Sequence, residues 1–378
     1  MNLAIKEIKH TTGKFIATAM GVGMLLGIVL IMIGVVRGMI NDAKVLANDI
    51  QADLWVVQDK TIGPFAESSK IHEDLENILK AVPGVKITAP FTFQTTQFPL
   101  KTRTIKVTVV GYDIFGDINP IKRLVSGRLP NKDHYEIVIN NKLKRKIGEK
   151  IKLGKDIFTI VGITRDSVDS GGNSLIYMSI KDAKKLQFSY TNPRIRSDRE
   201  RGIKSGNNDL VNTIVIKLHK GYNPNKIKKH IEKYYHKAVF TQKQEIKILS
   251  TRVIEKALKQ IGAFTSILII VATIIIGLII YTMTLEKMKE ISIMKLIGIP
   301  NRVIVEMIFQ ETIILGSLAF IFGNLFAYLI YDKFPKHILL LQSDAWILFS
   351  VIIVSSLLSS LIGVKKVILA NPQEAIGG

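Results

Sequence analysis

The chain contains four long apolar segments, and these constrain its fold more than any other feature. The first, Phe15–Val36, holds no charged residue, and as a helix rising about 1.5 Å per residue it spans a hydrocarbon core of about 30 Å. Three more apolar segments follow near the C-terminus. We therefore expect a membrane α-helical protein with four transmembrane helices, at residues 15–37, 261–284, 303–331 and 345–364.

Basic residues close to these segments predict how the chain is oriented. They cluster before the first segment, between the second and third, and after the fourth: Lys6, Lys9, Lys14; Lys287, Lys289, Lys295, Arg302; Lys365, Lys366. Because such clusters favour the cytoplasmic side, we expect a multi-pass membrane protein with both termini cytoplasmic. Residues 1–14, 285–301 and 365–378 are then cytoplasmic, and the short loop 332–344 is outside.

Residues 38–258 separate the first two spans, and they read as a folded domain outside the membrane. Short strand-like runs alternate with turn residues, at 52–57, 104–112, 135–140, 150–154, 157–163, 174–180 and 213–218. Helical patterns lie at 69–81, 180–186 and 223–236, and a further one, Glu245–Lys259, is expected to lead into the second span as one rigid helix. This mixture predicts a large α+β extracytoplasmic domain.

The segment 191–209 of this domain is charged and poor in apolar residues. Such a run is typical of a solvated insertion. The alternative is a loop that contacts a partner protein, through four arginines: Arg194, Arg196, Arg199 and Arg201.

Several kinds of chemistry lack their motifs. No G-x-x-x-x-G-K-[ST], H-E-x-x-H or G-x-S-x-G pattern occurs, the chain has no Cys, and its seven His residues are scattered without metal-ligand spacing. We expect no enzyme activity, no bound cofactor and no metal. A formal net charge of +21 raises the question of nucleic acid, but no binding motif accompanies it, so we expect the basic residues to meet an anionic bilayer or acidic partners.

Residues 285–298, after the second span, form the most informative stretch. Apolar and charged residues alternate at helical spacing, and Gly298 and Pro300 end the pattern. A short amphipathic helix on the cytoplasmic face is predicted, either anchored at the interface by lysines or docked on a partner. The pattern E-K-x-x-E-I-x-I-x-K-x-I-G resembles the coupling segment of FtsX-like, MacB-type ABC transporter permeases, with Leu296 where the family commonly has alanine.

Further motifs carry the same resemblance. The third span contains Phe309, Gln310 and Glu311, and the tail A-N-P-Q-E-A-I contains Pro372, Glu374 and Ala375, although Asn371 replaces the family's acid. In the outer domain, the resemblance lies in Gly127-Arg128, Glu136–Ile139, Ile147–Lys150 and Ile160–Ile163.

The resemblance implies a permease subunit of a bacterial inner membrane that pairs with a second copy or a similar chain in the bilayer. A separate cytoplasmic ATPase dimer would bind the ATP and Mg²⁺, and a periplasmic adaptor and outer-membrane channel would follow where the cell has an outer membrane. The residues implied in ATPase coupling are Glu286, Lys287, Glu290, Ile291, Lys295, Leu296 and Gly298. Leu296 and Ile291 would supply apolar contact, and Glu290, Lys287 and Lys295 orienting charges.

The function implied is export of a drug, peptide, lipid or haem driven by that ATPase. Extraction of lipids or lipoproteins, and force transmission to cell-wall hydrolases, are alternatives within the family. A membrane sensor or adhesin is an alternative from another class, but it has no need of the segment at 285–298.

Overall fold

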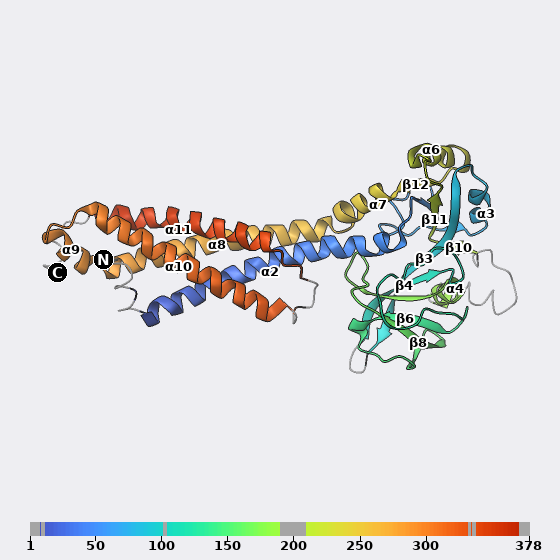
Figure 1. The fold of residues 1–378 in the computed structure, drawn as a ribbon, viewed down its shortest axis with the longest axis horizontal. Coiled ribbons are helices and arrows are strands. Elements are labelled where there is room, and N and C mark those ends of the chain that lie inside the picture. The colour runs from blue at the N-terminus through green and yellow to red at the C-terminus, as the bar shows by residue number, and fades with distance from the viewer. Residues whose placement is uncertain are drawn as a thin grey trace. The chain divides into compact units, whose positions relative to one another are not determined.

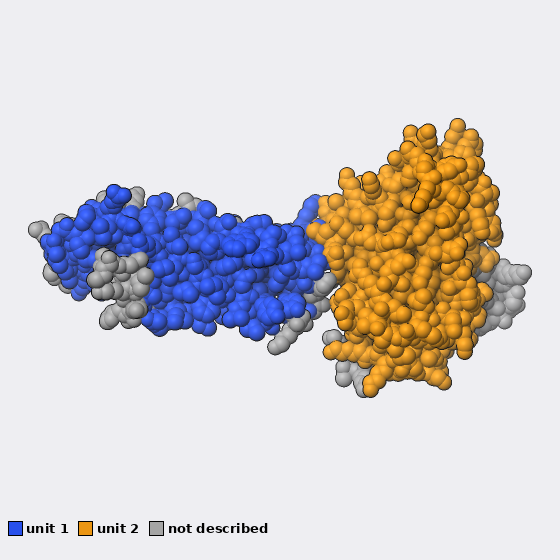
Figure 2. All heavy atoms as spheres, viewed as in Figure 1, with its two compact units in different colours: residues 1–38, 257–378 blue, residues 39–256 orange. Residues whose placement is uncertain are grey.

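The computed structural model describes residues 8, 12–100, 104–189, 209–331, 334 and 338–369. The chain folds into two compact units, residues 1–38 with 257–378 and residues 39–256 (Figure 2). The second unit is continuous in sequence and is therefore an insertion in the first.

The first unit is helical (Figure 1). Its helices are α2 (Thr12–Ile50), α8 (Glu255–Glu286), α9 (Met288–Leu296), α10 (Asn301–Ile330) and α11 (Gln342–Leu369), of which α2 and α8 continue into the second unit. Three of them, α2, α8 and α10, are long and apolar enough to cross a membrane. In α11 the apolar stretch within the described residues is Gln342–Val354, which is shorter than a span.

Helix α2 runs well beyond the predicted first span of residues 15–37. Its last turns bury Ala43, Leu46, Ala47 and Ile50, a spacing that puts apolar side chains on one face of a helix. The sequence prediction ended at Arg37 because it followed the membrane-length apolar run, whereas the helix continues as an amphipathic one.

Helices α2 and α10 approach each other through glycines. A Cβ atom added to Gly27 would lie 2.8 Å from the Gly323 carbonyl oxygen, and one added to Gly323 would lie 2.8 Å from the Gly23 oxygen. Backbones can come this close only where side chains are absent, which is how small residues favour helix packing in lipid. Gly323 is thus a close-packing position between the two helices.

The second unit is built on a ten-stranded mixed sheet in the order β12-β1-β11-β3-β4-β9-β6-β8-β5, with β7 paired to β8, and a separate β10-β2 pair. Its strands are β1 (Leu54–Val57), β2 (Ile71–His72), β3 (Val85–Pro99), β4 (Thr104–Tyr112), β5 (Leu124–Gly127), β6 (Glu136–Asn140), β7 (Lys150–Leu153), β8 (Asp156–Thr164), β9 (Ser174–Ser179), β10 (Leu210–Val211), β11 (Thr213–Leu218) and β12 (Ala238–Thr241). Most pairs are antiparallel, and β4–β9 and β6–β8 are parallel.

Helices α3 (Leu75–Lys80), α4 (Ile180–Ser189) and α6 (Pro224–Tyr235) belong to the same unit. Two buried clusters form its core. One gathers Leu54, Ile71, Leu79 and Ile231 with their neighbours, and the other gathers side chains from β4, β6, β8, β9 and α4.

Strand β3 joins these two halves. Its first part pairs with β11, from Val85 to Phe91, and its second part pairs with β4, from Phe91 to Pro99. The seven strands that the sequence predicts are confirmed, and five were not predicted: β2, β3, β5, β10 and β12. The longest of these, β3, was missed because Pro90 and a run of Thr and Gln residues hide its alternation.

The predicted continuous helix at Glu245–Lys259 is wrong. Helix α7 (Gln242–Ile248) starts at a capping box on Thr241, a π-helical turn covers Leu249–Val253, and α8 begins only at Glu255. The Ser250 and Thr251 hydroxyls donate to the carbonyl oxygens of Ile246 and Lys247, at 2.8 and 2.6 Å. Such back-bonding loosens a helix, and π turns mark interruptions in helical stretches.

Glu245, on α7, is fully buried, and neither carboxyl oxygen has a hydrogen-bond partner within the described residues. The loop after β1 packs directly on it, because a Cβ atom added to Gly63 would lie 2.4 Å from Glu245 Oε2. Burial raises the pKa of the Glu245 carboxyl to about 8, and no charged neighbour offsets this effect. The strands that pack on α7, β1 and β12, carry no titratable side chain.

We predict that Gly27→Leu separates α2 from α10 and destabilises the first unit by about 1–3 kcal/mol, because the added side chain overfills a close contact. The measurement is the thermal unfolding midpoint of the chain in detergent. Gly21→Leu is the matched control, since a Cβ atom there meets nothing within 4 Å. Equal midpoints for the two variants would contradict the close contact.

We predict that Glu245 makes the free energy of unfolding fall as pH rises. The unfolded chain releases this proton near the ordinary glutamate pKa of 4.5, whereas the folded domain holds it until a pKa of about 8. Stability is therefore lost between these pH values, by about 1.4 kcal/mol per pKa unit and a few kcal/mol in all. Denaturant unfolding from pH 5 to 9 should show this slope.

Glu245→Gln should remove that slope, while Asp117→Asn, a change at an exposed acid, should keep it. A Glu245→Gln variant that retains the full pH dependence would contradict the assignment.

Candidate coupling site

A break between two helices creates the site at residues 286–298. Helix α8 ends at Glu286, and Lys287 has φ −90° and ψ 3°, so the chain turns before α9 starts at Met288. At its other end, the amides of Gly298 and Ile299 donate to the carbonyl oxygens of Lys295 and Met294, each at 3.0 Å. This is a Schellman motif, which needs a left-handed residue, and Gly298 has φ +91°.

Two ion pairs fix this elbow, residues 286–298, to neighbouring helices. Glu286 pairs with Lys14 at the start of α2, and Lys287 pairs with Glu311 in α10. The first pair is exposed, whereas the side chains of Lys287 and Glu311 are only 11% and 10% exposed. Separating a buried ion pair is strongly unfavourable, because either charge left alone in a low-dielectric interior loses its compensation.

The apolar residues of the elbow divide into two groups. Ile291 is 1% exposed and packs with Ile304 and Ile308 of α10, together with Met288 and Met294. The predicted partner contact of Ile291 is therefore replaced by a contact within its own chain. Leu296 and Ile297 are 58% and 76% exposed, and Ile293 also faces outward. These three, Ile293, Leu296 and Ile297, are called the exposed apolar edge.

The charged residues Glu290 and Lys295 of the elbow differ in exposure. Glu290 is exposed and Lys295 half-buried, and both lie on α9. Gln310 does not join the buried pair, since its Nε2 donates to Glu306 at 3.4 Å. The sequence analysis named Lys287 and Glu311 separately, and their ion pair was not predicted. The sequence did contain a signal for this pair, because charges of opposite sign lie near the facing ends of two successive apolar segments, where charged residues tend to pair.

Two groups of predicted site residues lie outside the described residues. They are the tail residues Pro372, Glu374 and Ala375, and the loop arginines Arg194, Arg196, Arg199 and Arg201.

In the second unit, the motif residues that carry the family resemblance meet around β5, β6 and β8. Arg128 holds Glu136 through two hydrogen bonds of 2.6 and 2.9 Å, and the Asn131 amide adds a third at 2.9 Å. The Arg128 hydrogen bonds lower the pKa of the Glu136 carboxyl to about 2. Gly127, at φ +84°, and Gly162 allow β5 to approach β8, since a Cβ atom added to Gly162 would lie 2.6 Å from the Arg128 oxygen. These residues are structural.

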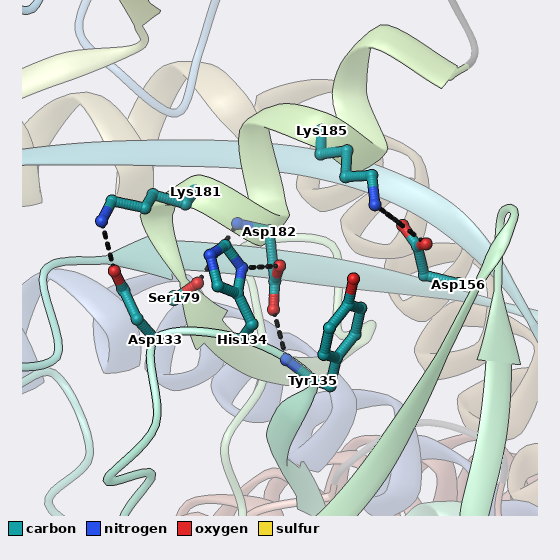
Figure 3. A network of polar contacts seen from close by, with 8 residues as sticks. All are labelled: Asp133, His134, Tyr135, Asp156, Ser179, Lys181, Asp182 and Lys185. Atoms are coloured by element: carbon teal, nitrogen blue, oxygen red, sulfur yellow. Dashed lines mark hydrogen bonds and ion pairs between the residues drawn. The ribbon is translucent and has the colours of Figure 1, made fainter.

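A polar network beside this motif also holds the fold (Figure 3). The buried Asp182 of α4 lies 2.8 Å from His134 Nδ1 and accepts from the Tyr135 amide at 2.7 Å. Lys181 and Lys185 of α4 form ion pairs with Asp133 and Asp156. The Ser179 hydroxyl accepts from the Asp182 amide at 3.2 Å. Among these eight residues, no contact joins the Ser179 hydroxyl to the His134 imidazole. The network attaches residues 133–135 to α4, through Asp182 and Lys181.

These features define a membrane-spanning chain with a large inserted domain of α and β structure and a helical elbow. Comparison with protein families gives its class. Residues 15–234 match the MacB-like periplasmic core domain, and residues 262–372 match the FtsX-like permease C-terminal domain. The chain belongs to the MacB/FtsX-like family of ABC transporter permeases.

Full-length relatives agree with this assignment. An uncharacterized ABC transporter permease of Mycobacterium tuberculosis (strain CDC 1551 / Oshkosh) is 25% identical over 377 residues, covering 99% of each chain. A protein of Staphylococcus haemolyticus, provisionally named hemin transport system permease protein HrtB, is 25% identical over 397 residues, covering 100% of this chain and 99% of its own.

Among solved structures, the periplasmic region of MacB from Actinobacillus actinomycetemcomitans matches with a TM-score of 0.38 and 11% identity, covering 55% of this chain and 98% of its own. The family assignment rests on the family models.

We predict that Glu311→Gln destabilises the first unit by about 3–5 kcal/mol, because it leaves the Lys287 ammonium buried without its counter-charge. The readouts are yield and unfolding midpoint in detergent. The double variant Lys287→Glu with Glu311→Lys should recover part of the loss. Lys14→Gln, at the exposed pair, should change little. A Glu311→Gln protein as stable as the parent would contradict the role of the pair.

Proposed function

We propose that this chain is the membrane subunit of an ABC transporter that exports a substrate, and that the exposed apolar edge of its elbow docks on a separate cytoplasmic ATPase. The observation that carries the proposal is the exposure of Leu296 and Ile297 on an elbow that a buried ion pair fixes to α10. Exposed apolar residues on a fixed element are typical of a binding surface. ATP and Mg²⁺ would be held by the partner, so this chain itself is not an enzyme.

The elbow is suited to transmitting motion from a bound ATPase to helices α8 and α10. Its first residues border α8 and its buried face packs on α10, so a push on α9 would move both helices together. The ATPase would thereby bias two arrangements of the membrane helices, which is what coupling requires. The π turn at Leu249–Val253, just before α8, would serve as the point where the outer domain responds.

The membrane arrangement is part of the proposal. We propose that α11 is a fourth span, that both termini and the elbow are cytoplasmic, and that two copies assemble in the bilayer. An adaptor and an outer-membrane channel would complete the path where an outer membrane exists. The name of the staphylococcal relative adds hemin to the cargo screen, beside drugs, peptides and lipids.

The test is co-purification of the tagged chain in detergent with its candidate ATPases, followed by ATP turnover. Leu296→Asp should abolish the complex, because it places a charge in an apolar contact. Glu290→Lys should leave expression intact and abolish coupled turnover. Lys289→Gln, on the same helix, is the matched control and should behave as the parent. Unchanged turnover in both Leu296→Asp and Glu290→Lys would overturn the elbow assignment.

A further inference from the structure

The second unit contains a cavity of about 240 Å³ that no part of the proposed coupling uses. An engineered cavity of about 150 Å³ binds benzene, so this one has room for a larger aromatic group. Part of its wall is apolar, formed by Ala43 and Leu46 of α2 and by Leu249 of the π turn. The rest comes from the loop after β1, from β3 and β4, from the segment before β9, and from Asn212 between β10 and β11.

Two aromatic rings line the cavity. Phe65 and Phe93 are both half-buried, and their ring centroids lie 4.7 Å apart, with the planes inclined at 49°. Trp55 contacts Phe65 edge to face, with 5.3 Å between the ring centroids. Aromatic faces carry negative potential, which attracts organic cations as well as apolar groups.

The charges that line the cavity are all negative. Glu67 and Asp169 contribute carboxylates, and the described lining residues include no Lys, Arg or His. This contrasts with the formal net charge of +21 for the whole chain. Asp169 is held by neutral donors, from Thr108 at 2.6 Å and from Asn173 and Gly171 at 2.8–2.9 Å. Its charge is therefore positioned but not neutralised by an ion pair among the described residues.

Among the described residues, Glu67 accepts one hydrogen bond, from the Ile62 amide at 3.1 Å, and its side chain is exposed. The cavity wall also holds a buried hydrogen-bond donor, Gln94 Nε2, that has no partner in the described part of the chain. A buried donor of this kind favours a ligand that brings an acceptor.

We propose that this cavity binds a small organic cation with an aromatic or apolar body, held over Phe65 and Phe93 with its charge toward Glu67 and Asp169. A carbonyl or ether oxygen on the ligand would meet Gln94. That such a cation is cargo rests on the proposed function. The binding site itself does not.

The test is titration calorimetry of the full chain in a non-ionic detergent with benzyltrimethylammonium, an aromatic cation, and with benzyl alcohol, its neutral counterpart. The cation should bind about tenfold more tightly, since the aromatic faces and both carboxylates favour charge. Glu67→Gln should weaken the cation about three- to tenfold and leave the alcohol unchanged. Phe93→Leu should weaken both.

Asp117→Asn is the matched control, because Asp117 is exposed and outside the lining, and the change removes the same charge. Equal affinities for cation and alcohol, or equal effects of Glu67→Gln and Asp117→Asn, would overturn the site. Circular dichroism confirms that each variant is folded.

This titration needs no ATPase, so its failure and the failure of the proposed function are distinguishable. In the assembled complex, the cation should stimulate ATP turnover in the parent and in Asp117→Asn, but not in Glu67→Gln. Binding without stimulation would overturn the cargo interpretation.

Discussion

The buried ion pair between Lys287 and Glu311 is the interaction on which the helical unit depends. It lies where α8 breaks and α9 begins, and it ties this break to α10. Two such charges persist in an apolar interior only when each neutralises the other, so the pair fixes one register between the helices. Ile291 completes the attachment by packing on α10, which leaves Leu296 and Ile297 outward.

The sequence predicted the parts of the molecule that a local pattern encodes. The three membrane helices and strands such as β4 and β8 follow from apolar runs and alternation. The elbow's end at Gly298 follows from the requirement for a left-handed residue. These features need no knowledge of what lies opposite in space.

Features that depend on distant partners were not predictable in this way. Strand β3 is defined by two different neighbours, β11 and β4, and Pro90 within it argues against a strand. The division of the elbow's apolar residues depends on which face α10 covers, and spacing along α9 does not reveal it. Lys287 and Glu311 were both identified, but their pairing is a tertiary fact.

The second unit combines a ten-stranded sheet with local features that break its regularity. At one edge of the sheet, Arg128 pairs with Glu136, and Gly127 and Gly162 let β5 lie close to β8. Before α8, the π turn at Leu249–Val253 interrupts what would otherwise be one continuous helix, and the buried Glu245 lies on α7 just ahead of it. The acidic, aromatic cavity borders the same π turn through Leu249. On our proposals, a ligand there would act on the segment that receives motion from the membrane helices.

The most direct test of the account is labelling at the elbow. The chain has no Cys, so Leu296→Cys provides a single reactive thiol for a membrane-impermeant maleimide in inverted vesicles. The account predicts rapid labelling of the chain alone and strong protection when the ATPase is bound, with Ser250→Cys, outside the helical unit, unlabelled from that side. Equal labelling at position 296 with and without the ATPase would contradict the central claim.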